Sequence, residues 1–161
     1  MKQLKIFNND KVAILDDDDY IRILSMELKW YFNSGLIKAN QKYFAGEIIK
    51  SRNILLHRVI MEAKDPTVLV DHKDRDPFNN TRANLRFCTK SQNNANRVAY
   101  GKSGYKGVTW NKRHNKWHAQ MKHHGNQLSF GYFESKIEAA LEYNKHAAIL
   151  QGEFAVLNVI K

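Results

Sequence analysis

Cysteine is almost absent from this chain. Cys88 is the only cysteine among its 161 residues. A disulfide within the chain needs two cysteines and a cysteine-based zinc knuckle needs several, so neither can form. We therefore expect Cys88 to be a small buried apolar residue rather than a reactive thiol.

Long apolar segments are also missing. Residues 1–5 lead into no apolar stretch of the secretory-signal type, and no later run is long enough for a transmembrane helix. The sequence also has no low-complexity segment of the activation type and no nuclear-targeting run. The missing signal and transmembrane segments predict a cytoplasmic protein with no membrane partner. The missing activation-type and nuclear-targeting segments weigh against a plant-like regulator.

Acidic residues are missing from a long central stretch. Between Pro77 and Phe133 there is no Asp or Glu, while ten basic residues occur there. They are Arg82, Arg86, Lys90, Arg97, Lys102, Lys106, Lys112, Arg113, Lys116 and Lys122. The formal net charge of +10 indicates a polyanionic partner. A membrane surface would require a basic amphipathic helix, whereas this region is predicted to form mainly strands and turns, so nucleic acid is the better partner.

The segment from residue 68 to residue 93 has a clear order of predicted elements. Apolar residues 68–70 predict a short strand, and residues 85–88 predict a second strand that can pair back antiparallel. Residues 74–80, rich in Asp, Pro and Asn, predict the turn between them. Thr89 or Ser91 suits the N-cap of a following helix. The local fold is therefore predicted to be strand, loop, strand, helix.

Three polar side chains lie where these elements meet. Asp71 and His72 directly follow the first apolar run, and Asn93 falls in the first turn of the predicted helix. Carboxylate and amide oxygens are hard ligands that suit Mg²⁺, which keeps several waters and binds substrate phosphate. A neighbouring histidine can take a proton from water near neutral pH, and the metal can stabilise charge on the attacked phosphate. The grouping is typical of a phosphodiesterase.

The same residues carry a resemblance to a known family. Asp71-His72, Asn84 and Asn93 resemble the H-N-N variant of the HNH nuclease signature, as in phage-encoded homing endonucleases. The flanking frame matches too, namely Leu56-His57-Arg58-Val59-Ile60-Met61, Asn79-Asn80 and Asn84-Leu85-Arg86. The variants of that family that need a four-cysteine zinc site are excluded by the single cysteine.

The resemblance implies a ββα-metal fold with one Mg²⁺ (or Mn²⁺) ion per active site. In that fold His72 would be the general base, and Asp71 and Asn93 would be the metal ligands. Asn84 would pin the loop and orient the imidazole. The products would carry 5′-phosphate and 3′-hydroxyl ends. The alternative is a β-hairpin whose Asn and Asp residues only make turns.

The region before this module, residues 1–53, is predicted to be a β-rich scaffold. Residues 4–7 and 12–15 predict two strands, and residues 29–32 and 37–44 predict further ones. Aspartates at positions 16–19 precede a helical apolar pattern. Acids complement the positive end of a helix dipole, so we expect the four aspartates to begin a helix rather than bind a metal.

A helix over residues 55–63 is predicted to precede the nuclease core. His57 lies on this helix, and we expect it to be a hydrogen-bonded structural group. The alternative for His57, together with Arg58, is a phosphate contact near the scissile bond. Candidate contacts to the DNA backbone elsewhere are Arg82, Arg86 and Arg97.

After a joint with two glycines at residues 100–104, the pattern predicts three strands and a helix. Residues 108–110 and 116–122 predict the first two strands, and Leu128 and Phe130 continue the apolar face on the third. A capping box at residues 135–138 opens a helix that ends at Gly152. This helix is expected to cover the apolar face of the sheet and to leave the polar, basic face free for the major groove of DNA.

Residues 103–159 resemble the Apetala-two/ERF-type DNA-binding domain. The matching residues are Tyr105-Lys106-Gly107-Val108, Lys116-Trp117-His118-Ala119-Gln120-Met121-Lys122, Phe130-Gly131-Tyr132-Phe133, Glu138-Ala139-Ala140 and Ala155-Val156-Leu157-Asn158. By position, the DNA-facing residues of that family fall on Lys106, Thr109, Gln120, Lys122, Gln127 and Ser129. Several of these differ from the plant members, which carry Arg or Trp at positions 109, 127 and 129 and Glu at position 120. The plant target sequence is therefore not carried over.

Together these features predict an α+β fold in three parts. They are the N-terminal scaffold (residues 1–53), a central ββα-metal module (54–100), and a three-stranded antiparallel sheet packed on one helix (101–161). The predicted function is a metal-dependent endonuclease acting on double-stranded DNA, of the phage homing type. We expect a monomer without a protein partner, in the host cell cytoplasm if phage-encoded. The alternative is a DNA-binding transcriptional regulator with a vestigial nuclease module, whereas an RNA-binding module would need an exposed aromatic platform.

Overall fold

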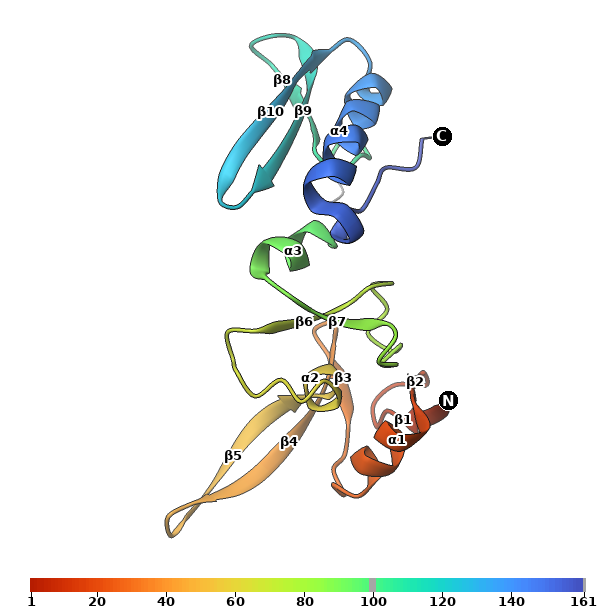
Figure 1. Cartoon of the computed structure of the whole chain (residues 1–161), viewed down its shortest axis with the longest axis vertical. Helices are drawn as coiled ribbons and strands as arrows, with labels where there is room; N and C mark the ends of the chain where they lie inside the picture. Colours follow the sequence, from red (N-terminus) through yellow and green to blue (C-terminus); the bar gives the residue numbers. More distant parts are fainter. Residues whose placement is uncertain (99–100, 161) are drawn as a thin grey trace. The chain divides into compact units, whose positions relative to one another are not determined.

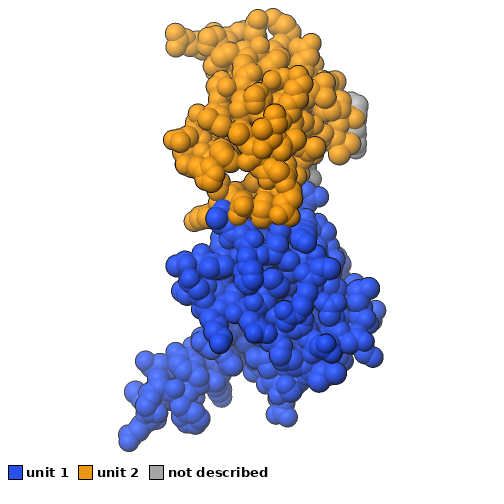
Figure 2. All heavy atoms as spheres, in the orientation of Figure 1, with its two compact units in different colours: residues 1–89 blue, residues 90–161 orange. Residues whose placement is uncertain are grey.

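The chain is organised in two compact units, residues 1–89 and residues 90–161 (Figure 2). The computed structural model describes residues 1–98 and 101–160. Tyr100, which the sequence predicts to lie in the joint, falls outside the described residues. The two units are therefore treated one at a time.

The first unit begins with a hairpin and a short helix. Strand β1 (Lys2–Lys5) pairs antiparallel with β2 (Val12–Leu15), which confirms the predicted hairpin. Helix α1 (Asp17–Leu24) follows, with Asp16 at the N-cap position and three aspartates in its first turn. These carboxylates lie at the positive end of the helix dipole, so the prediction that the acidic run begins a helix is confirmed.

A three-stranded antiparallel sheet comes next, in the order β3-β4-β5 (Figure 1). Its strands are β3 (Tyr31–Asn33), β4 (Leu36–Ala45) and β5 (Ile48–Leu55). Strand β5 was not predicted, because this segment lacks the alternation of apolar and polar residues that marks a half-buried strand. Helix α2 (Leu56–Ile60) is shorter than predicted, since residue 55 still belongs to β5.

The strand–loop–strand prediction for the central segment is confirmed. Strand β6 (Leu69–His72) pairs antiparallel with β7 (Leu85–Cys88), and residues 73–84 form the loop between them. Side chains from the whole unit share one core. Its members are Leu4, Ile6, Ala13, Leu15, Ile23, Trp30, Ile37, Ala39, Leu56, Ile60, Val70, Phe78 and Leu85. The N-terminal scaffold is thus built into the same core as the nuclease segment.

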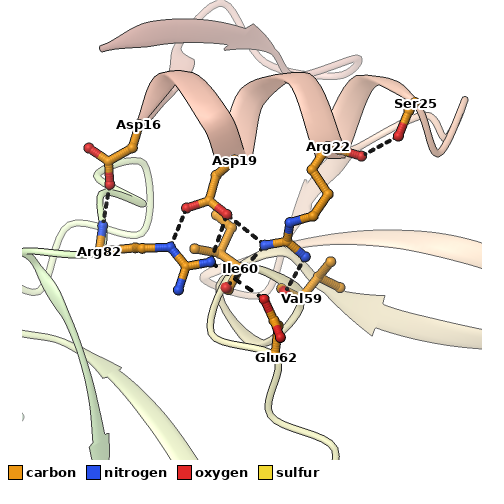
Figure 3. Close-up of polar contacts among 8 residues, drawn as sticks. All are labelled: Asp16, Asp19, Arg22, Ser25, Val59, Ile60, Glu62 and Arg82. Atoms are coloured by element: carbon orange, nitrogen blue, oxygen red, sulfur yellow. Dashed lines mark hydrogen bonds and ion pairs between the residues drawn. The ribbon is translucent and has the colours of Figure 1, made fainter.

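Asp19 ties α1 to the loop between β6 and β7 (Figure 3). Its buried carboxylate accepts hydrogen bonds from Arg82, at 2.7 and 2.9 Å, and from Arg22, at 2.6 Å. Arg22 also donates to the carbonyls of residues 59 and 60 at the end of α2. The backbone N–H of Arg82 donates to the carboxylate of Asp16 at 2.8 Å. Burial would raise the pKa of Asp19, but the two arginines hold it below its usual value.

The second unit starts with helix α3 (Lys90–Ala95) and contains a three-stranded antiparallel sheet in the order β10-β9-β8. The strands are β8 (Val108–Asn111), β9 (Lys116–His123) and β10 (Asn126–Phe133). Helix α4 (Lys136–Gln151) begins at Ser135, whose hydroxyl accepts from the N–H of Ile137 at 3.1 Å. A short 3₁₀ helix, η1 (Gly152–Phe154), follows it. The predicted three strands and capped helix are confirmed.

Helix α4 covers one face of this sheet (Figure 1). Small and aromatic side chains of the helix are buried against the strands. They are Ala139, Ala140, Tyr143 and Ala147 on α4, packed near Val108, Ala119 and Met121 on the sheet. Among the residues that the structure describes, no helix has the length and apolar character needed to cross a bilayer.

Candidate active site

Asp71 and His72 occupy the last two positions of β6, where the register pairs them with Arg86 and Leu85 of β7. The carboxylate of Asp71 is buried and forms an ion pair with Arg86, with Oδ2 at 3.2 Å from Nε and 3.1 Å from Nη2. Arg86 is itself only 8% exposed. Its guanidinium is buried against Asp71, and the predicted contact of Arg86 with the DNA backbone stays a prediction.

Asn84 closes the loop between the two strands. Its side-chain oxygen accepts from the N–H of Asp74 at 3.1 Å, and its amide nitrogen donates to the carboxylate of Asp74 and to the carbonyl of Asn79. Its main-chain carbonyl accepts from the N–H of Lys73. These bonds hold both ends of the turn against β7. Asn84 has the loop-pinning contacts that the resemblance implies.

The imidazole of His72 is contacted by Asn80 rather than by Asn84. Nε2 of His72 lies 3.2 Å from Oδ1 of Asn80, a fully buried residue. The amide nitrogen of Asn80 donates to the carbonyl of Pro77 at 2.7 Å, so its oxygen must face the ring. An acceptor opposite Nε2 favours the tautomer in which Nε2 carries the proton and Nδ1 has the lone pair. The expectation that Asn84 orients the imidazole is corrected accordingly.

The role of Asn80 was not predicted, although the residue belongs to a matching motif in the sequence. Asn79-Asn80 was part of the frame of the resemblance, yet neither residue was given a role. An Asn in a turn is usually explained by local hydrogen bonds to the backbone. Only the folded loop reveals that Asn80 bonds to the backbone with its nitrogen and to His72 with its oxygen.

His57 packs edge-on against His72, with the ring centroids 5.2 Å apart. It is 6% exposed, and burial, with smaller contributions from His72 and Arg58, lowers its pKa to about 4. The burial of the ring supports the structural interpretation of His57, and a phosphate contact there stays a prediction. Burial also lowers the pKa of His72, although the hydrogen bond with Asn80 and nearby carboxylates oppose the shift. A neutral imidazole is the form that can accept a proton.

Arg58 is a structural residue. Its guanidinium donates to the carbonyls of Ala63, at 2.9 Å, of Asp65, at 2.7 Å, and of Val68. These bonds fix the segment that leads from α2 into β6. These bonds account for three of its N–H donors, and the alternative of a phosphate contact at Arg58 stays a prediction.

The N-terminal hairpin is hydrogen-bonded to the loop between β6 and β7. The N–H of Ile14 on β2 donates to the carbonyl of Phe78, and the N–H of Asn80 donates back to the carbonyl of Ile14, both at 2.8 Å. Arg82, predicted as a DNA contact, is held in ion pairs with Asp19 and Glu62. Its side chain remains half exposed, so a DNA contact there stays a prediction.

The hard oxygen donors expected for a magnesium ion are present in part. Asp71 supplies a carboxylate in the first unit, while Asn93 lies on α3 in the second unit, so their meeting stays a prediction. Within residues 1–98 and 101–160, no three His, Cys, Asp or Glu side chains gather as a metal site. Mg²⁺ needs only one or two protein oxygens beside water and phosphate, so this donor set fits it. Cys88, buried beside Asp71 with its pKa raised to about 11 by burial, is not a thiolate ligand.

The residues predicted to face DNA in the second unit divide into two kinds. Lys106 directs its ammonium at the carbonyl of Ala95, the last residue of α3, and its backbone is hydrogen-bonded to Asn158. A DNA contact by Lys106 stays a prediction. The other five predicted residues lie on the sheet face away from α4, namely Thr109, Gln120, Lys122, Gln127 and Ser129.

These polar residues are linked across the strands. Gln120 donates to the hydroxyl of Thr109 at 2.9 Å, and Gln127 donates to the side-chain oxygen of Gln120 at 3.1 Å. Ser129 is 2.7 Å from Nε2 of His118. Lys122 is exposed on the same face. The face is thus an ordered polar surface, and its contact with DNA stays a prediction, as does that of the exposed Arg97.

Comparisons with known proteins single out the segment that contains this site. Residues 55–95 match a family described as HNH endonuclease. The chain is also 31% identical over 134 residues to an uncharacterised HNH endonuclease of Acanthamoeba polyphaga mimivirus. That similarity covers 82% of this chain and 67% of the viral protein. No solved structure is significantly similar to the chain.

Proposed function

The chain belongs to the HNH endonuclease family, and from this we propose that it hydrolyses phosphodiester bonds of double-stranded DNA with the help of a divalent metal ion. One observation carries the proposal. The segment that matches the family holds His72 as a neutral imidazole, fixed by Asn80 at the end of a strand and beside the carboxylate of Asp71.

His72 is the proposed general base. Oδ1 of Asn80 lies 3.2 Å from Nε2 and fixes the ring, and the imidazole takes a proton from the attacking water. Burial against His57 keeps the ring neutral near pH 7 and therefore ready to accept that proton. Asn84 keeps the loop closed and acts as a positioning residue.

Asp71 and Asn93 are the proposed ligands of one Mg²⁺ or Mn²⁺ ion. Such an ion, when bound, stabilises the charge on the attacked phosphate and on the leaving oxygen. Arg86 holds the carboxylate of Asp71 through Oδ2 at the end of β6. The products are proposed to carry 5′-phosphate and 3′-hydroxyl ends.

The second unit is the proposed DNA-binding domain, of the Apetala-two/ERF type. Its sheet presents an ordered polar face with Lys122 exposed on it, and the segment around it has basic residues without acidic ones. A sheet face of this kind can lie in the major groove and position the nuclease on its site. A phage homing role is part of this proposal.

The alternative is a DNA-binding regulator whose nuclease module is vestigial. The intact set of Asp71, His72, Asn84 and Asn93 argues against it.

Cleavage of supercoiled plasmid in the presence of Mg²⁺ tests the proposal. Wild type should nick or linearise the DNA, EDTA should abolish the reaction, and His72→Ala should lose cleavage while it retains binding. His124→Ala, an exposed histidine in the turn between β9 and β10, is the control and should cleave like wild type. Strong cleavage by His72→Ala would overturn the assignment. No cleavage by wild type, with clear binding to DNA from several phage genomes, would favour the regulator.

A further inference from the structure

The hairpin formed by β4 and β5 projects from the first unit (Figures 1 and 2). The strands pair without interruption from Lys38 and Leu55 at the base to Ala45 and Ile48 at the tip. The base is anchored, since Ile37 and Ala39 belong to the core and Ile54 packs against it. From residue 40 to residue 53 no side chain is buried. This segment is called the arm.

The tip of the arm is apolar on both faces. Phe44 pairs with Ile49 on one face, and Ala45 pairs with Ile48 on the other. Phe44 is 79% exposed, Ile48 is 64% exposed and Ile49 is 61% exposed. A two-stranded hairpin is marginally stable alone in water, and clustered exposed apolar side chains mark a surface that another molecule covers.

The stem of the arm is cationic. Lys42, Lys50 and Arg52 are all exposed, and Glu47 in the turn is the one acidic residue of positions 36–55. Lys42 lies on one face of the ribbon, while Lys50 and Arg52 lie on the other. A partner with negative charge on two sides matches this arrangement.

Arg52 is held in place before any partner binds. Its Nε and Nη2 donate to the side-chain oxygen of Gln41 at 3.1 and 3.0 Å. Its guanidinium also lies 5.5 Å from the ring centroid of Tyr43. A fixed guanidinium loses less conformational entropy on contact with a phosphate.

We propose that the arm enters a groove of duplex DNA, with its cations on the flanking phosphates and its apolar tip among the bases. A two-stranded ribbon fits a groove that has a phosphate backbone on each side, and apolar wedges at base steps are a known means of kinking the duplex. The inference rests on duplex DNA as the substrate of the proposed function and names a contact surface for it outside both the catalytic loop and the C-terminal sheet.

The salt dependence of DNA binding tests the stem. Binding of the full chain with His72→Ala to a labelled duplex is measured in EDTA, so that the result does not depend on cleavage. Replacing Lys42, Lys50 and Arg52 by Gln should lower the slope of log affinity against log salt by about 2 to 3, at about 0.9 for each lost phosphate contact. A variant with Lys2, Lys5 and Lys64 changed to Gln carries the same change of charge outside the arm and is the control.

The tip is tested by Phe44→Ser together with Ile49→Ser. Both side chains are exposed, so the fold should persist, which circular dichroism verifies. Affinity should fall by at least about tenfold, as expected when buried apolar area is lost, with little change in the salt slope. An apolar tip between bases distorts the duplex, and this distortion can be measured as a change in plasmid linking number. In the same EDTA buffer, with a metal-independent topoisomerase, the protein with the unsubstituted arm should change the linking number, and the tip variant should not.

Two results would overturn the proposal. One is a stem variant whose salt slope falls no more than that of the control. The other is a tip variant that binds DNA like the parent but loses self-association in sedimentation, which would make the arm a protein contact. The two proposals can also fail separately. If the wild-type chain never cleaves DNA but the arm variants still lose DNA binding, the proposed role of the arm stands and the proposed nuclease activity does not.

Discussion

The imidazole of His72 is held by a neighbouring amide, and this contact favours the tautomer in which Nε2 carries the proton. The oxygen of Asn80 is directed at Nε2 because the amide nitrogen is bound to the carbonyl of Pro77. Asn79, one residue earlier, bonds instead to Asp74 and Thr81 and does not belong to this pair. The two neighbouring asparagines thus make different contacts: Asn80 bonds to His72, and Asn79 bonds within the turn.

Replacing Asn80 by Ala should change the tautomer of His72. Without the acceptor at Nε2, the neutral ring should populate both tautomers, and kcat/KM should fall on the order of 10- to 100-fold, as for other residues that orient a functional histidine. Nitrogen chemical shifts of the ring in histidine-labelled protein report the tautomer. Asn79→Ala disturbs the same turn without touching His72 and should keep the wild-type tautomer. If Asn80→Ala keeps the Nε2–H tautomer and full activity, the positioning role is wrong.

Burial of His57 should make stability depend on pH. The pKa of His57 is about 4 in the folded chain and about 6.5 when unfolded, so the unfolded state binds more protons between these values. The free energy of unfolding is therefore highest above about pH 6.5, falls as the pH drops toward 4, and levels off below. The difference that His57 contributes between these two limits is about 3 kcal/mol. The lowered pKa of His72 acts in the same direction.

Urea unfolding at several pH values between 4 and 7.5 measures this dependence. His57→Gln removes the titrating group and should flatten the rise in unfolding free energy with pH, whatever its own stability. Equal slopes for wild type and His57→Gln would show that the buried ring is not what couples stability to pH.

At the scale of elements, Gly107 allows α4 to pack on the sheet. It has φ +73°, and an added Cβ would lie 2.0 Å from Cδ2 of Tyr143 and 2.7 Å from the carbonyl oxygen of Gln120. Tyr143 is almost fully buried, and burial raises its pKa to about 12. The ring therefore has no free space into which it could move. The helix lies against the sheet only because residue 107 has no side chain.

Gly107→Ala should destabilise the second unit by about 3–5 kcal/mol, since it combines overpacking with backbone strain. Gly125→Ala is the matched control, because Gly125 has φ +86° with no atom within 4 Å of the added Cβ. It should cost only the strain of the left-handed backbone, about 1–2 kcal/mol. Thermal unfolding of both variants measures the difference. Similar losses in the two would mean that contact with Tyr143 does not limit the packing.

The elements differ in how far the sequence predicts them. The sheet and helix of the second unit follow from clean alternation on β9 and from the Ser135 cap, both local signals. Strand β5 was missed because its residues face water on both sides, so no burial pattern exists for periodicity to detect. The partner of Asn80 and the burial of Arg86 depend on contacts between distant segments, which residue spacing does not encode.

At the scale of the whole molecule, the two units divide the chain by core rather than by motif. The N-terminal hairpin, α1 and the three-stranded sheet share one core with the loop between β6 and β7, through Leu15, Ile23 and Phe78 among others. The sequence suggests a boundary near residue 53 because the residues that resemble the nuclease motif all come after it. Backbone bonds from Ile14 and the Asp19–Arg82 pair cross that point, and their sequence separation hides them from local patterns.

The division of labour between the units predicts opposite effects for two substitutions. His72→Ala should remove cleavage and leave DNA affinity intact, because the imidazole acts on the water and not on the duplex. Lys122→Ala should weaken binding and lower the salt slope by about 0.9, the loss of one phosphate contact, while cleavage at saturating protein is retained.

Lys145→Ala is the control for Lys122, since Lys145 lies on α4, which covers the other face of the sheet, and pairs with Glu142. Binding isotherms at several salt concentrations, followed by single-turnover cleavage, separate these effects. If Lys122→Ala and Lys145→Ala bind alike, the polar sheet face is not where the second unit contacts DNA, and the basic residues outside the sheet must supply the charge that binds it.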